Sequence, residues 1–231
     1  MNESTAKQFQ FSRAWSGWWW LIDRDLFRVL PILILWTVVE VSLYIFDGAL
    51  GLTPTISWLS TTTIVEPFFM GVLYAVALRD DPVPLSVAAG ASLNRFVSLF
   101  VLYVLSLLGT VVGLVLLILP GLALLVLWSV AYPILMAEQT GPIEALSRSF
   151  RAVKSSFWPV CGVVAIYLIG IIAFGIATAF FTPTEFTSPS LTFLFLESGS
   201  TVVFGFLGIY LNTAIYRELG FSGQHDLSVF D

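Results

Sequence analysis

Two glutamates interrupt long apolar stretches of this chain and are its strongest candidates for chemistry. They are Glu40 and Glu66. An ionisable side chain inside a membrane is costly and usually faces a cavity or the interior of a helical bundle. At about 1.5 Å per helical residue, Glu40 lies roughly 18 Å from Arg28, and Glu66 lies roughly 20 Å from Arg79. We therefore expect the two carboxyl groups at similar depth on neighbouring helices.

Hydroxyl side chains accompany both acids. Thr62 and Thr63 precede Glu66 by four and three residues, so all three share one helix face. Pro67 follows directly and is expected to bend the helix and expose carbonyl groups before it. Thr37 precedes Glu40 by three residues and lies on the same helix face. The pattern predicts a polar pocket near the membrane midplane, a setting in which transporters bind ions. In the alternative interpretation, each acid only hydrogen-bonds to a threonine or a backbone carbonyl and serves packing.

The composition indicates that the helices carrying these acids lie in a membrane. Of the 231 residues, 58% are hydrophobic and 11% are charged, whereas a soluble domain carries roughly a quarter charged residues. The chain cannot cover a water-facing surface, which excludes a soluble globular enzyme. A net charge of −5 disfavours nucleic acid as a partner.

Signatures of enzymes and cofactor sites are absent from the sequence. Cys161 is the one cysteine and His225 the one histidine, so neither a disulfide nor a Cys/His metal site is expected. The chain has no His-Glu-x-x-His and no Gly-x-Ser-x-Gly motif. We therefore expect no catalytic residue, no metal and no cofactor.

Apolar runs predict an all-α bundle of six membrane-spanning helices. Each run is close to the 20 residues needed to cross the hydrocarbon core, and Gly or Pro residues separate the members of each hairpin. Pro120 and Gly121 are expected to break an uncharged stretch of 42 residues between the third and fourth spans. The predicted spans are 27–46, 55–78, 96–119, 122–137, 158–181 and 191–216.

The basic residues predict the orientation of this bundle. All ten lie in the N-terminal segment, in the loops after the second and fourth spans, or at the C-terminal end, which six spans place on one face. The positive-inside rule makes that face cytoplasmic, with both termini inside. The ten are Lys7, Arg13, Arg24, Arg28, Arg79, Arg95, Arg148, Arg151, Lys154 and Arg217.

Three cytoplasmic stretches are expected to form amphipathic helices in the membrane interface. The first is 1–26, whose tryptophans Trp18, Trp19 and Trp20 are expected at headgroup level. The second, 84–95, is weaker. The third is 142–157. The first precedes the six-helix domain of 27–219, the other two lie within that domain, and 220–231 form a cytoplasmic tail.

The third stretch carries the clearest pattern. Its apolar stripe is Ile143, Leu146, Phe150, Val153 and Phe157, with Glu144 and Arg148 expected to pair across one turn. Arg148, Arg151 and Lys154 are candidate contacts for anionic lipid. In the alternative interpretation, these bases only anchor the helix and fix the topology.

Small residues and a weak internal repeat complete the pattern. Gly109 with Gly113, and Gly175 with Ala179, have the spacing that lets membrane helices approach closely. An offset of 58 residues aligns Tyr74 with Tyr132 and Pro84 with Pro142, which suggests duplicated hairpins.

The segment from Leu119 to Val164 resembles a known family. It contains Leu119-Pro120-Gly121, then Tyr132-Pro133, then Glu138-Gln139-Thr140-Gly141 and Ala145-Leu146-Ser147-Arg148-Ser149. The pattern is similar to that of a bacterial family of six-span proteins of uncharacterised function, which includes the UPF0259 proteins. It is also similar to the membrane domain of some glycerophosphodiester phosphodiesterases. The resemblance implies a bacterial inner-membrane location and no established activity. It does not imply phosphodiesterase activity, because those phosphodiesterases carry catalysis in a separate soluble domain.

These observations favour one function and leave two alternatives. The first is a non-enzymatic inner-membrane protein that organises the envelope or its lipids, with membrane lipids as partners. The second is a small proton- or cation-coupled transporter or channel with a Glu40/Glu66 site. The third is an accessory subunit, which requires a membrane protein partner or self-association.

Overall fold

The computed structural model describes residues 9–51, 61–179 and 191–220, and every element within them is a helix. The predicted all-α class is therefore confirmed for this part of the chain. Five helices are long and apolar enough to cross a membrane: Phe11–Ala49, Leu85–Leu116, Ile118–Glu138, Phe157–Thr178 and Leu191–Glu218. A shorter apolar helix spans Thr63–Ala77. It occupies the described part of the predicted second span, the beginning of which lies outside the described residues.

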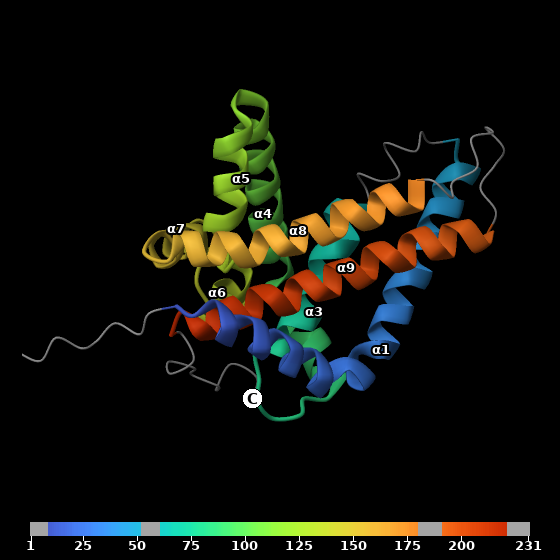
Figure 1. Ribbon diagram of the computed structural model, residues 1–231. Helices are drawn as coiled ribbons and strands as arrows, with labels where there is room; N and C mark the ends of the chain where they lie inside the picture. The colour runs from blue at the N-terminus through green and yellow to red at the C-terminus, as the bar shows by residue number, and fades with distance from the viewer. Residues whose placement is uncertain (1–8, 52–60, 180–190, 221–231) are drawn as a thin grey trace, which may run out of the picture.

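Helix α1 (Phe11–Ala49) joins two elements that the sequence analysis separated, the interfacial helix 1–26 and the span 27–46. It is continuous by hydrogen bonding but changes direction along its length (Figure 1). Pro31 lies inside it, and an internal proline bends a helix because it cannot donate to the preceding turn. Trp18 was expected at headgroup level, yet it is buried and its Nε1 donates to the Leu207 carbonyl at 3.0 Å. Trp19 and Trp20 remain exposed.

A π-helical turn, η1 (Thr61–Val65), leads into α3 (Glu66–Ala77), and α4 (Leu85–Leu116) follows. The stretch 84–95 is not a separate interfacial helix, because α4 runs without interruption into the third predicted span. Helices α3 and α4 pack closely where Ser92 Oγ donates to the Phe68 carbonyl at 2.7 Å.

The turn between α4 and α5 (Ile118–Leu127) differs from the prediction. The break falls at Leu117, whose backbone is extended, and Pro120 and Gly121 lie in the first turns of α5. Proline is tolerated there because the first N–H groups of a helix have no intrahelical partner. The small residues act as predicted within this hairpin: a side chain at Gly113 would meet Gly121, and one at Gly109 would meet the Trp128 ring. Gly175 has no such neighbour in the described part of the chain.

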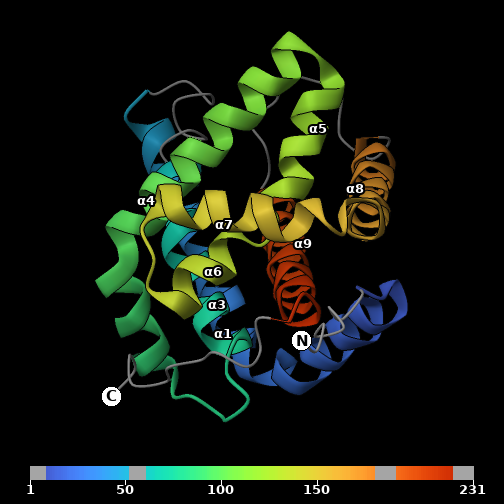
Figure 2. The ribbon, with the colours of Figure 1, turned by 90° about the vertical axis from the view of Figure 1, so that its left-hand side faces the viewer.

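The remaining described residues form α6 (Ala131–Glu138), α7 (Pro142–Lys154), α8 (Phe157–Ala179) and α9 (Leu191–Glu218). Pro142 begins α7 as expected. Figure 2 shows α7 crossing in front of α4, close to the end of α5, and leading into α8. Its buried face is Ala145, Ser149 and Val153, whereas Ile143 of the predicted apolar stripe is 74% exposed.

The bundle has two arms. Helix α1 packs mainly along α9, and α3 packs mainly along α4. The α4–α5 hairpin projects away from the α8–α9 pair (Figure 1), and the core lies where the arms meet. Fully buried side chains there include Trp36, Tyr74, Tyr210 and Tyr216.

Candidate intramembrane polar site

Glu66 lies at a change in helix geometry. The five residues before it form the π turn η1, and the α-helix begins at Glu66 itself, followed by Pro67. The irregularity falls directly before Pro67, which cannot donate a hydrogen bond to the preceding turn. Single π turns inside helices are frequent at functional sites. The backbone thus places a half-buried carboxyl at a distorted point of a short apolar helix.

Glu66 is held by a tyrosine from the next helix. The Tyr103 hydroxyl of α4 donates a hydrogen bond of 2.8 Å to Glu66 Oε2. Glu40 of α1 is buried, next to Trp36, and close enough to Glu66 for their charges to interact. Among the residues that the structure describes, neither acid has a basic partner. The two acids therefore form a neighbouring pair whose charge is compensated only by neutral donors or by a bound cation or proton.

Tyr103 also lines a half-open cavity of about 240 Å³, the polar cavity, named for the hydroxyl and amide groups in its wall. Such a volume holds several water molecules, since one water occupies about 30 Å³ in the liquid. Six of the nine residues that line it carry a hydroxyl or amide group, although most of the wall surface is apolar. The lining residues are Tyr103, Ser106, Leu107, Thr110, Leu125, Trp128, Ser129, Tyr132 and Asn212.

A break in a membrane helix forms one wall of this cavity. The apolar helix Ile118–Glu138 is interrupted at Trp128–Val130, between α5 and α6. The Leu127 carbonyl accepts a hydrogen bond of 2.7 Å from Ser149 Oγ of α7, which keeps it satisfied. Ser129 is only 7% exposed, and its hydroxyl has no hydrogen-bond partner among the residues that the structure describes. Broken helices with polar groups at the break are where transporters place their ion sites.

Two further tyrosines connect the cavity to other helices. Asn212 Nδ2 of α9 donates to the Tyr74 hydroxyl of α3 at 3.2 Å. Tyr74 stacks on Tyr132, with ring centroids 5.9 Å apart and planes 4° from parallel. These are the two tyrosines aligned by the 58-residue offset. The contacts fix α3, α6 and α9 around the cavity wall.

The other residues predicted for this site have different surroundings. Thr37 Oγ1 donates to the Leu33 carbonyl of its own helix at 2.9 Å. Thr63 is half-buried, and the Thr62 side chain lies outside the described residues. The described part of the chain contains no group of three or more His, Cys, Asp or Glu residues that could hold a metal.

Sequence reasoning missed Tyr103, Ser106, Thr110, Ser129 and Asn212. A signal for three of them was present, because Tyr103, Ser106 and Thr110 follow each other at spacings of three and four in a span without charge, which places them on one helix face. Ser129 and Asn212 carried no comparable signal.

A buried ionic cluster, also missed, joins α1, α3 and α9. Asp25 is 1% exposed and accepts hydrogen bonds from Arg24 (2.6 and 3.0 Å) and from the Tyr210 hydroxyl (3.2 Å). Arg217 donates to the Ala77 and Leu78 carbonyls at the end of α3, and pairs with Asp80 at 2.7 Å. Asp25 lies on the buried stripe of α1, in register with Trp18, Leu21, Ile22, Val29, Ile32, Trp36 and Glu40. This spacing was visible in the sequence.

The three candidate lipid contacts on α7 differ from one another. Arg148 is half-buried and forms an ion pair of 2.5 Å with Glu138 of α6, not with Glu144 as expected. The turn at Gln139, which has a left-handed backbone (φ 52°), brings α6 and α7 together and makes this pairing available. Arg151 and Lys154 are exposed.

The fold and this site define a class of protein: an all-helical chain with several helices long and apolar enough to cross a membrane, and a polar cavity among them. These features are those of a multi-pass integral membrane protein. Comparisons of the chain with protein-family models, curated proteins and solved structures gave no match.

Proposed function

We propose that this protein is a small, non-enzymatic transporter or channel for a proton or a monovalent cation, with Glu66 as the binding carboxyl. One observation carries the proposal: Tyr103 hydrogen-bonds to Glu66 and also lines the polar cavity at the helix break. A tyrosine hydroxyl both donates and accepts hydrogen bonds. It therefore connects the acid to whatever occupies the cavity.

The chemistry of the wall favours a cation or proton over an anion. Carboxylate, hydroxyl and amide oxygens are ligands for hard cations. Among the described residues no arginine or lysine lines the cavity, and Tyr103 links it to Glu66 and its neighbour Glu40. An anion in this cavity would find no basic partner among the described lining residues, so we exclude anions from the proposal.

A liposome flux assay tests this function. The purified full chain, reconstituted with a pH- or sodium-sensitive dye inside, is exposed to a proton, sodium or potassium gradient. We expect flux from the wild type, and loss of that flux in Glu66→Gln and Glu40→Gln. Glu197→Gln is the matched control, because Glu197 is exposed at the far part of α9. Absence of flux under every gradient overturns the proposal.

We further propose six spans in a bacterial inner membrane, with both termini cytoplasmic. The start of α1 and the end of α9 lie together, since Arg13 Nη1 is 3.8 Å from Glu218 Oε1. An even number of crossings keeps both ends on one side, and the apolar helix Thr63–Ala77 supplies a sixth crossing beyond the five long helices. The basic residues and the resemblance of 119–164 to the six-span family support the same topology. Reporter fusions at each loop test it, and an external signal from either terminus contradicts it.

A second candidate function is organisation of the envelope or of membrane lipids. The exposed bases Arg151 and Lys154 of α7, together with the exposed Trp19 and Trp20 of α1, favour it. Indole rings and basic side chains are typical of membrane interfaces. Preferential binding of the purified protein to anionic over neutral lipid supports this function, and equal binding to both contradicts it.

A further inference from the structure

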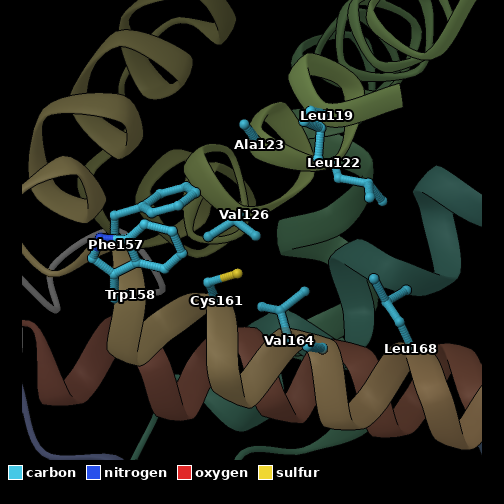
Figure 3. A pocket seen from close by; sticks show the side chains of 10 residues that line it. Leu119, Leu122, Ala123, Val126, Phe157, Trp158, Cys161, Val164 and Leu168 are labelled. Atoms are coloured by element: carbon cyan, nitrogen blue, oxygen red, sulfur yellow. The ribbon is translucent and has the colours of Figure 1, made fainter. Parts of the chain in front are cut away.

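An apolar groove of about 350 Å³ separates α5 from α8. Figure 3 shows Leu122, Ala123 and Val126 of α5 on one wall, and Cys161, Val164 and Leu168 of α8 on the other. The groove lies where the α4–α5 hairpin diverges from the α8–α9 pair. It is distinct from the polar cavity, since the two share no lining residue.

The groove faces outward within the apolar part of the molecule. Leu119 and Trp158, at its rim, are each 79% exposed. Both walls belong to helices long and apolar enough to cross a membrane, so acyl chains surround this surface in a bilayer. The α8 wall from Trp158 to Leu168 extends over roughly 15 Å. An elongated, apolar and laterally open space of this kind fits an acyl chain.

Positive charge lies at one end of the groove. Lys154 is the last residue of α7, and Phe157, which lines the groove, begins α8 three residues later. Arg151 lies one turn before Lys154. Both side chains are exposed, and neither has an acidic partner among the residues that the structure describes. Arg148, by contrast, is already paired with Glu138.

We infer that the groove binds one anionic phospholipid of the bilayer, with an acyl chain between α5 and α8 and the phosphate at Arg151 and Lys154. Two bases at the mouth of an apolar groove match the two chemically different parts of such a lipid. The inference goes beyond transport at Glu66, and it rests on and deepens the lipid role named as the second candidate function. Failure of this site can be told apart from failure of the second candidate function. The interfacial role requires only α7 and the tryptophans, whereas this site also requires the groove.

Native mass spectrometry of the full chain, released from micelles with added phosphatidylglycerol or phosphatidylcholine, tests the inference. We expect one phosphatidylglycerol retained per chain, about tenfold more strongly than phosphatidylcholine. The double variant Arg151→Ala/Lys154→Ala is expected to lose this preference, whereas Arg13→Ala, an exposed base on α1, keeps it. Equal retention of both lipids by the wild type overturns the inference.

A groove-filling variant separates this site from general interfacial binding. Ala165→Trp places an indole in the groove and is expected to lose the retained lipid. Ile166→Trp adds the same side chain on the neighbouring exposed position of α8, outside the groove lining, and is expected to keep it. Ala123→Phe, from the α5 wall, replaces Ala165→Trp if that variant fails to fold. If a folded groove variant still retains the lipid, the groove site is contradicted, whether or not the protein still prefers anionic lipid.

A measurement on the unmodified chain gives an independent result. Cys161 is the only cysteine of the protein, is free, and lines the groove. Phosphatidylglycerol added to the micelles is expected to slow its reaction with N-ethylmaleimide about tenfold more than phosphatidylcholine does. An unchanged rate with phosphatidylglycerol overturns the inference.

Discussion

The Tyr103 hydroxyl lies 2.8 Å from Glu66 Oε2 and joins the middle of α4 to the first residue of α3. Tyr103→Phe removes this hydrogen bond and leaves the ring in place. We expect the liposome flux to fall about tenfold, corresponding to about 1.4 kcal/mol for one hydrogen bond. Tyr167→Phe is the matched control, because that hydroxyl donates to the Phe204 carbonyl away from the cavity. Wild-type flux in Tyr103→Phe would show that this hydroxyl takes no part in the pathway.

Asp25→Asn tests the ionic cluster that joins α1 to α9. The carboxylate is 1% exposed and bonded to Arg24 and Tyr210. Asp25→Asn weakens these hydrogen bonds and leaves Arg24 with the exposed Asp80 as its acidic partner at 3.7 Å, a loss of about 1.5–3 kcal/mol. We expect a clearly lower thermal unfolding temperature for the variant in detergent.

Asp23→Asn is the control for that measurement, since Asp23 is an exposed acid two residues earlier on the same helix. Its effect is expected to stay within about 0.5 kcal/mol. Equal unfolding temperatures for the two variants would contradict a structural role for the cluster.

Gly109→Ala tests the close packing inside the α4–α5 hairpin. A Cβ at Gly109 meets the Trp128 ring, so the indole must move and the hairpin is overpacked by about 1–3 kcal/mol. Trp128 also lines the polar cavity, and the variant is expected to reduce flux. Gly175→Ala, which meets no neighbour in the described structure, is expected to leave stability unchanged or slightly raised. Unfolding in a denaturant series measures both, and equal destabilisation would argue against the packing.

Arg148→Ala and Arg151→Ala separate two roles on one helix. Arg148 pairs with Glu138 at 2.5 Å, and its loss is expected to cost about 1.5–3 kcal/mol of stability. Arg151 is exposed, so its replacement is expected to affect lipid retention and not unfolding. Thermal unfolding and native mass spectrometry on the same samples measure both. A destabilised Arg151→Ala with normal lipid retention would reverse this assignment.

The sequence by itself determined the class of the protein and most of its helices. Its low charge and its apolar runs require a membrane, and Pro142 marks the first residue of α7. Such features depend on neighbours along the chain, because hydropathy and helix initiation are local. The same local rules misplaced the α4–α5 break, which falls at Leu117 and not at Pro120–Gly121, since proline is acceptable in a first turn.

Only the tertiary structure decided which faces meet. Helical periodicity places Glu66 or Tyr103 on a face, but the contact between them joins residues 37 apart in sequence. Asn212 and Tyr74 are 138 apart, and Tyr210 and Asp25 are 185 apart. Such pairings depend on how whole helices pack, because membrane helices associate through surface fit and hydrogen bonds that no single segment contains. The carboxyl in the second apolar stretch was evident from the sequence; the cavity that Tyr103 links to it exists only in the folded bundle.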